Sequence, residues 1–252
     1  HSRAHDGYMQ ETLWYTKDHS EESWISDWVM LIERYKDNPA VVAADLKNEP
    51  HGNTTNGMKP PATWGYDQDG YGTTDWRKAA VKCGQAILKV NPKIILIVEG
   101  VENYRGDNYW WGGNLKGVAD FPIKDSEIPA SNLWYSAHEY GPEVYNQTWF
   151  SASNFPDNMS DIWDSKFWFI HKEGIAHLFF GEFGIKEASA ADHNSTAYKW
   201  LRPFMEYVGK DSSWTFWCMN PNSGDTEGIL KDDWVSVNKA KYEMIKPYLA
   251  MD

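Results

Sequence analysis

The strongest constraint on the fold is an alternation between short apolar segments and longer amphipathic ones. Helical periodicity covers residues 20–36, 75–90, 160–173, 192–209 and 235–249. Between these segments lie five apolar runs with the composition of strands: "AVVAADL" (40–46), "KIILIVEG" (93–100), "NLWYSAHEYG" (132–141), "AHLFFGEFG" (176–184) and "SSWTFWCMN" (212–220). Strands that alternate with helices predict βαβ units and therefore a parallel sheet.

Most of these predicted strands end in polar or ionisable residues. They are Asn48 with Glu49, Glu99, His138 with Tyr140, Glu182, and Trp217 ahead of Asn220. In a (β/α)8 TIM barrel, catalytic groups gather at the C-terminal ends of the strands. An open doubly wound sheet usually carries a glycine-rich phosphate loop after its first strand, and no GxGxxG or Walker-type motif occurs here. We therefore expect an α/β fold of the (β/α)8 class.

The segment "AADLKNEPHG" (43–52) ends an apolar run with a carboxylate followed by a proline. Pro50 has no N–H, so a strand's hydrogen-bond ladder stops there. Proline also pushes the preceding residue toward an extended conformation. We expect Glu49 to be extended at the last position of a strand. This motif alone fits a solvated strand end and a positioned acid equally well.

A second carboxylate, Glu182, ends an apolar strand within "FFGEFG", where Gly181 and Gly184 permit close approach of backbone or ligand. His138 and Tyr140 are two residues apart, so they share one face of their strand. Two carboxylates at strand ends are what glycoside hydrolysis requires. The sequence contains no HExxH, EF-hand or GxSxG pattern. It therefore gives no support for a catalytic zinc site, a calcium-binding loop or a serine nucleophile.

The composition excludes several classes of function. Net charge is −12, which disfavours nucleic acid as a partner, and no run of apolar residues is long enough to span a membrane. Fifteen Trp and fourteen Tyr residues exceed the needs of one core, so some are expected to be exposed for stacking on sugar rings. Cys83 and Cys218 are expected to be free buried thiols.

Five segments then occur in a fixed order: "DLKNEPHG", "EGVENYRGDNYWWGGNL", "YSAHEYGPEVYNQTWF", "GEFG" and "WTFWCMNPNSGDTEGILKDDW". Together they resemble glycoside hydrolase family 5, specifically its bacterial endo-β-1,4-glucanases, from about residue 13 onward. The resemblance implies that Glu49 is the general acid/base and Glu182 the nucleophile of a retaining reaction, with carboxyl groups about 5–5.5 Å apart. The substrate-binding residues that it implies are Asn48 on the sugar 2-hydroxyl, His138 beside the acid/base, Tyr140 on the nucleophile, Trp217 as a sugar platform, Trp110 or Trp111 with Asn114 along the cleft, and His1 at the end of strand 3.

The sequence departs from the family in one respect. If Glu49 ends strand 4, three βα units should precede it, but only 48 residues do. We therefore expect the chain to cover the barrel from about the end of strand 3 through helix 8, as one catalytic domain over residues 1–252. The family's arginine at the end of strand 2 has no counterpart, since Arg3 lies in a different context.

The leading hypothesis is a secreted, monomeric, retaining endo-β-1,4-glucanase that hydrolyses cellulose or soluble β-glucan through a covalent glycosyl-enzyme, without cofactor or metal. The same mechanism on mannan or mixed-linkage glucan is an open alternative. So is a catalytically silent carbohydrate-binding domain, although stacking alone would not need both carboxylates with Asn48, His138 and Tyr140.

Overall fold

The structure is a computed structural model that describes residues 11–55 and 58–249. Its chain divides into two compact units. The first unit comprises His1–Ala137 and Lys166–Leu178, and the second comprises His138–Ser165 and Phe179–Asp252. The boundary falls inside two strands, after Ala137 and after Leu178.

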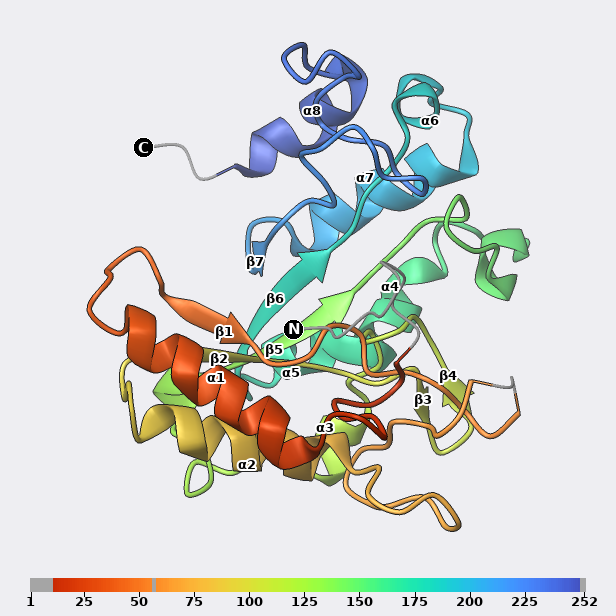
Figure 1. Ribbon diagram of the computed structural model, residues 1–252. Helices are drawn as coiled ribbons and strands as arrows, with labels where there is room; N and C mark the ends of the chain where they lie inside the picture. Colours follow the sequence, from red (N-terminus) through yellow and green to blue (C-terminus); the bar gives the residue numbers. More distant parts are fainter. Residues whose placement is uncertain (1–10, 56–57, 250–252) are drawn as a thin grey trace. The chain divides into compact units, whose positions relative to one another are not determined.

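The helices and strands follow the predicted alternation (Figure 1). The strands are β1 (Ala43–Asp45), β2 (Ile95–Glu99), β3 (Asn103–Tyr104), β4 (Asp107–Asn108), β5 (Leu133–His138), β6 (His177–Glu182) and β7 (Ser213–Trp214). The α-helices are α1 (Glu21–Tyr35), α2 (Trp76–Leu88), α3 (Gly117–Asp120), α4 (Met159–Trp163), α5 (Phe169–Lys172), α6 (Glu187–Ala191), α7 (Thr196–Val208) and α8 (Lys239–Ile245). Short turns of 3-10 helix cover Ala130–Asn132, Thr148–Ser151 and Lys246–Tyr248, and a π-helical turn covers Asp164–Trp168.

The sheet of the first unit is parallel, with the strands in chain order. Ala44 of β1 pairs with Leu96 of β2, and Val98 of β2 pairs with Tyr135 of β5. Helices α1 and α2 pack against each other and lie side by side below these strands in Figure 1. In α1, Ser20 accepts a hydrogen bond from the Ser23 N–H, which caps the helix as its sequence predicts.

A tryptophan cluster fills the core of the first unit. Trp14, Trp24 and Trp76 are all nearly fully buried, with ring centroids 5.6–6.4 Å apart. The indole N–H groups of Trp24 and Trp28 donate to the carbonyl of Leu46, at 3.2 and 3.0 Å. Helix α1 therefore holds the chain just after β1, where the segment leading to Glu49 begins.

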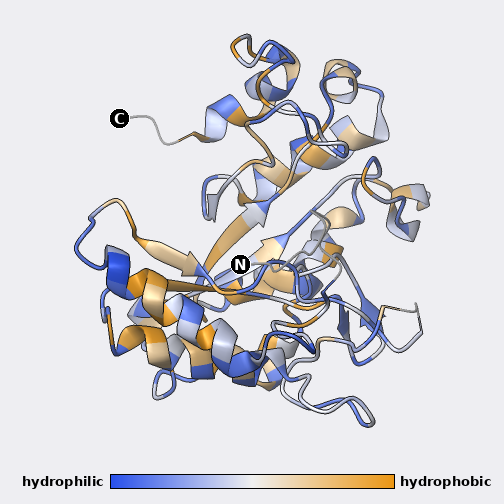
Figure 2. Ribbon diagram, viewed as in Figure 1, coloured by the Kyte–Doolittle hydropathy of each residue, from blue (hydrophilic) through white to orange (hydrophobic). Residues whose placement is uncertain are grey.

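In the second unit β6 pairs with β7 in parallel, Phe180 opposite Trp214. Figure 2 colours β6 as largely hydrophobic, whereas α7 alternates between polar and apolar residues. The buried face of α7 includes Trp200 and Phe204, and Phe204 meets Phe180 edge-on with centroids 5.2 Å apart. Because α6 packs against both α7 and α8, the loops that follow β6 and β7 rest on a helical base.

The structure corrects some of the predicted boundaries. Strand β7 has two residues, not nine, although Thr215 and Trp217 still donate to the carbonyls of Phe180 and Phe183. The single helix predicted over 192–209 is preceded by a separate helix, α6, and begins only at Thr196, because Ser195 caps it by accepting from the Tyr198 N–H. The loop after β2 contains an antiparallel hairpin, β3 with β4, that its polar composition concealed.

The two cysteines are free, as expected, but only Cys83 is buried; Cys218 is half-exposed. Burial raises the pKa of the Cys83 thiol. Among the residues that the structure describes, no helix is both long and apolar enough to cross a membrane.

Candidate active site

The predicted site residues fall in both units. In the first unit Glu49 lies four residues beyond the end of β1. Its φ is +50°, so the expected extended conformation is wrong. A left-handed conformation is uncommon for a residue other than glycine and requires support from its surroundings.

That support comes from Glu99, the last residue of β2. Its Oε2 accepts a hydrogen bond of 2.8 Å from the Glu49 N–H, and the Glu99 side chain is fully buried. Gly112 makes room for this contact, because a Cβ there would lie 2.2 Å from Glu99 Oε2 and 3.1 Å from the Glu49 Cα. Tertiary contacts thus override the local preference that Pro50 imposes on its neighbour.

His51 is a site residue that the sequence analysis did not single out. Its ring stacks on Trp111, with centroids 3.8 Å apart and planes 11° from parallel. Its Nδ1 lies 2.6 Å from the Glu49 carbonyl oxygen, and burial lowers the pKa of His51 to about 4. A neutral ring that donates from Nδ1 therefore connects Trp111 to the backbone of Glu49. Its place directly after "NEP" was the available signal, but a lone histidine is more often a core residue.

The other predicted residues of this unit differ in accessibility. Asn48 is half-buried, and its carbonyl accepts from the Lys47 ammonium, whose pKa burial lowers to about 8. Trp111 is half-buried, whereas Trp110 and Asn114 are only 6% and 1% exposed. The Asn114 amide donates to the Asp107 carbonyl and accepts from the Lys116 N–H, so it braces the loop that carries Trp111.

In the second unit, Glu182 ends β6 and contacts His138, the last residue of β5, and Tyr140, two residues further on. The Tyr140 hydroxyl donates to Glu182 Oε2 at 2.7 Å, and His138 Nδ1 lies 3.5 Å from the same oxygen. A hydrogen bond from a phenol stabilises the charged form of a carboxylate. The predicted contact of Tyr140 with Glu182 is therefore present, and the neighbour that the structure gives His138 within this unit is Glu182.

Glu139, between these two residues, is a second residue that sequence reasoning passed over. It is fully buried, and its N–H donates to the Glu182 carbonyl at 3.0 Å. Its Oε1 accepts from the indole N–H groups of Trp163 and Trp200, at 3.1 and 2.9 Å. This carboxylate points away from the face shared by its neighbours and anchors their segment to the helices of the unit.

Trp217 lies beyond β7, with 41% of its surface exposed. Its N–H donates to the Phe183 carbonyl at 2.8 Å, which sets it beside the chain that leaves Glu182. Gly184 allows this approach, because a Cβ there would lie 2.1 Å from the Trp217 carbonyl oxygen. His1, the remaining predicted site residue, lies outside the described residues.

The family model described as "Cellulase (glycosyl hydrolase family 5)" matches residues 1–223. The chain belongs to glycosyl hydrolase family 5. It is similar to an endoglucanase of Paenibacillus polymyxa, 45% identical over 240 residues, and to endoglucanase G of Acetivibrio thermocellus, 37% identical over 270 residues. Each alignment covers 94% of this chain, and the chain spans 56% and 46% of the two relatives.

Solved structures show the same fold. A hyperthermophilic endocellulase of the archaeon Pyrococcus horikoshii matches with a TM-score of 0.84 and 39% identity, over 94% of this chain and 65% of that one. The catalytic domain of the major endoglucanase of Xanthomonas campestris pv. campestris matches with a TM-score of 0.81 and 38% identity, over the same shares. The fold class expected from the sequence, a (β/α)8 barrel represented here by five parallel strands, is thus confirmed for this family 5 chain.

Proposed function

We propose that this chain carries the catalytic carboxylates of a retaining endo-β-1,4-glucanase that acts on cellulose or soluble β-glucan. Glu182 attacks the anomeric carbon and forms a covalent glycosyl-enzyme, while Glu49 protonates the departing glycosidic oxygen. Glu49 then removes a proton from water, which attacks the anomeric carbon and releases Glu182. Each displacement inverts the anomeric carbon, so the product keeps the β configuration.

The other residues bind and orient the sugar. Trp217 and the half-buried Trp111 stack on sugar rings, and Asn48 bonds the 2-hydroxyl. Tyr140 holds the Glu182 carboxylate; His138, expected beside the acid/base, also lies 3.5 Å from Glu182. Trp110 and Asn114 are both buried, so we do not propose that they contact the sugar. Their proposed role is to support the loop that carries Trp111.

The observation that carries this proposal is the 2.7 Å hydrogen bond from Tyr140 to Glu182. A pure stacking platform needs no anion held at the end of a strand, whereas a nucleophile does. Support also comes from relatives named endoglucanases and from a Pyrococcus horikoshii endocellulase whose structure is described as a complex with cellotetraose.

The first test replaces each carboxylate with its amide. Glu182→Gln and Glu49→Gln should each lower kcat on a soluble β-glucan by about three orders of magnitude or more, since each removes a group that acts in the transition state. Glu206→Gln and Glu33→Gln are matched controls, because both carboxylates are exposed, one in each unit. Circular dichroism checks folding, and near-full activity of either amide variant would refute its role.

External azide separates the two roles on an aryl cellobioside with a good leaving group. In Glu182→Ala, azide takes the place of the missing nucleophile and should give the α-glycosyl azide. In Glu49→Ala, the glycosyl-enzyme still forms and azide should attack it to give the β-glycosyl azide. The reverse assignment would exchange the two products. Trp fluorescence quenching by cello-oligosaccharides without any release of reducing ends would instead support a silent binding domain.

We further propose that both units belong to one catalytic domain over residues 1–252, because the family match runs through both. The proposed partner is a β-glucan polysaccharide, and the proposed protein is a monomer that needs no cofactor. Secretion is proposed from the relative named "major extracellular endoglucanase" in Xanthomonas campestris, 39% identical to this chain.

A further inference from the structure

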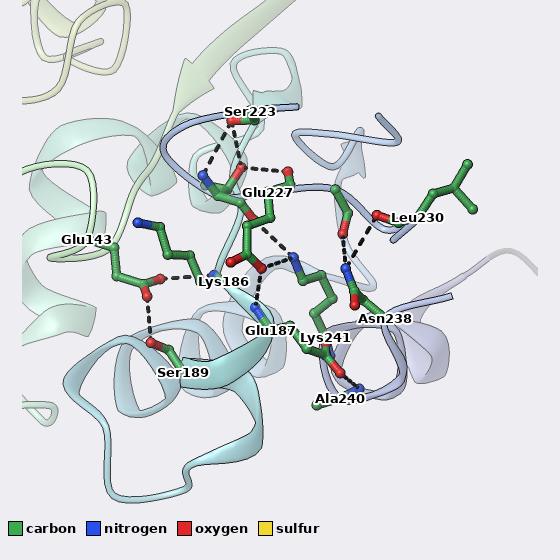
Figure 3. A network of polar contacts seen from close by, with 12 residues as sticks. Glu143, Lys186, Glu187, Ser189, Ser223, Glu227, Leu230, Asn238, Ala240 and Lys241 are labelled. Carbon is green, nitrogen blue, oxygen red and sulfur yellow. Dashed lines mark hydrogen bonds and ion pairs between the residues drawn. The ribbon is translucent and has the colours of Figure 1, made fainter. Parts of the chain in front are cut away.

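A buried lysine lies behind the loop that carries Trp217. Lys241, in the first turn of α8, has a side chain with no exposed surface. Its ammonium donates to the Thr226 carbonyl at 2.9 Å and lies 3.6 Å from Glu227 Oε2 (Figure 3). Removing an ammonium from water is costly unless it is paired and hydrogen-bonded. An apolar side chain would fill the same space without that cost, so packing alone does not account for a lysine here.

Thr226 links Lys241 to the backbone of Trp217 through two hydrogen bonds. Thr226 is fully buried, and its hydroxyl donates to the Trp217 carbonyl oxygen at 2.8 Å. The same carbonyl lies against Gly184, where a side chain would not fit. The backbone of Trp217 is thus fixed from two sides, while its indole remains partly exposed.

The base of this arrangement is itself anchored. The two carboxylate oxygens of Glu187, in α6, accept from the N–H groups of Ala240 and Lys241, at 3.0 and 3.1 Å. The Glu187 N–H donates to Glu227 Oε2 at 3.1 Å, so the start of α6, the loop and the start of α8 form one polar network (Figure 3). Burial lowers the pKa of Lys241, and the carboxylates of Glu227, Glu187 and Glu143 act in the opposite direction.

We propose that Lys241 is a positioning residue for substrate binding, which acts through Thr226 to fix the backbone and hence the indole of Trp217. The inference rests on the proposed role of Trp217 as a sugar platform. A purely structural role would confine Lys241 to holding α8 in place, with no effect that depends on Trp217.

A double-mutant cycle in the full chain distinguishes these roles. Lys241→Met removes the ammonium from an unbranched chain of similar length and should lower kcat/KM on cellotetraose about tenfold. In a Trp217→Ala background the same change should have no further effect, because the group that it positions is gone. Equal loss in both backgrounds would overturn the inference.

Thr226 supplies a milder pair of variants in case Lys241→Met does not fold. Thr226→Val keeps the shape but loses the hydroxyl, and it should show the same dependence on Trp217; Thr226→Ser should retain wild-type kcat/KM. Lys246→Met is the matched control, because it makes the same change at the C-terminal end of α8, where the Lys246 ammonium is exposed and pairs with Glu243. It should leave kcat/KM unchanged.

The cycle is read both in kcat/KM and in the dissociation constant of cellotetraose, measured by calorimetry. If the wild type hydrolyses cellotetraose but the effects of the Lys241 and Trp217 substitutions are independent, the positioning role is refuted and the proposed glucanase activity stands. If the wild type binds cellotetraose without hydrolysing it and the effects of the two substitutions on binding are coupled, the proposed enzyme activity is refuted and the positioning role stands. Absence of both binding and hydrolysis refutes both.

Discussion

Glu49 illustrates what decides the conformation of a single residue here. The rule for a residue before proline favours an extended backbone, yet Glu49 has a φ of +50°. The difference comes from Glu99, fifty residues along the chain, whose buried carboxylate accepts the Glu49 N–H. The sequence therefore points to Glu49 as a candidate acid, but the backbone conformation of this residue depends on a contact between distant segments.

His51 leads to a prediction at the same scale. Its pKa is lowered from 6.5 to about 4, so below pH 6.5 the unfolded chain takes up a proton that the folded protein does not. The stability from neutral His51 is therefore complete above pH 6.5, falls as the pH falls, and is lost by about pH 4. The total loss is about 3 kcal/mol.

The measurement is urea unfolding of the wild type and of His51→Gln at both ends of this range. The free energy of unfolding of the wild type should fall by about 3 kcal/mol more than that of the variant, which cannot titrate at this position. If both proteins lose the same stability, the ring is not held neutral by the fold.

At the scale of elements, the end of β2 is fixed by the loop that follows it. The Gly100 N–H donates to the carbonyls of Gly112 and Ser136, at 2.8 and 3.2 Å. A Cβ on Gly100 would lie 2.4 Å from the Asn114 carbonyl oxygen, which is a backbone atom and cannot rotate away. Glycine is required here for close approach between two stretches of backbone.

Gly100→Ala should therefore lower the free energy of unfolding by about 1–3 kcal/mol, as other forced contacts in packed regions do. Gly224→Ala is the matched control, because no atom lies within 4 Å of its added Cβ, and its effect should be close to zero. Denaturant unfolding measures both. Equal stability of the two variants would mean that the loop after β2 gives way easily.

The sequence predicted the order and type of these elements well, because hydrophobic periodicity is a local signal. All five predicted strands are present, and the cap at Ser20 is where the sequence indicates. The predicted strand at 212–220 shortened to two residues because hydrogen bonding to β6 becomes irregular beyond Trp214. Hydrogen-bond geometry of that kind depends on the partner strand and gives no periodic signal in the amino-acid sequence.

At the scale of the whole molecule, the ordered motifs carried most of the information about the site. They pointed to both candidate carboxylates and to the Tyr140 contact. Glu99 was expected only as an ionisable strand end, and His51 and Glu139 were not singled out, although all three support the predicted residues. Such supporting groups look like ordinary core residues in a single sequence. Their significance appears only when distances to Glu49 and Glu182 are known.

The net charge of −12 gives a prediction that concerns the whole chain. Carboxymethyl cellulose is anionic and should be repelled at low salt, whereas hydroxyethyl cellulose is neutral. Raising NaCl from about 10 to about 150 mM should lower KM for the anionic polymer about twofold or more, because salt screens the repulsion. KM for the neutral polymer should not change. Equal responses to salt would show that the charge lies too far from the bound polymer to matter.

The distribution of the two cysteines has a practical consequence. Each unit holds one thiol: Cys83 is enclosed in α2 of the first unit, and Cys218 is half-exposed in the second. A thiolate forms readily only where water can reach the sulfur, so alkylation of Cys83 must wait for α2 to open. Alkylation of Cys83 thus reports the opening of α2 in the unaltered chain, whereas the half-exposed Cys218 should react without any opening and gives the reference rate.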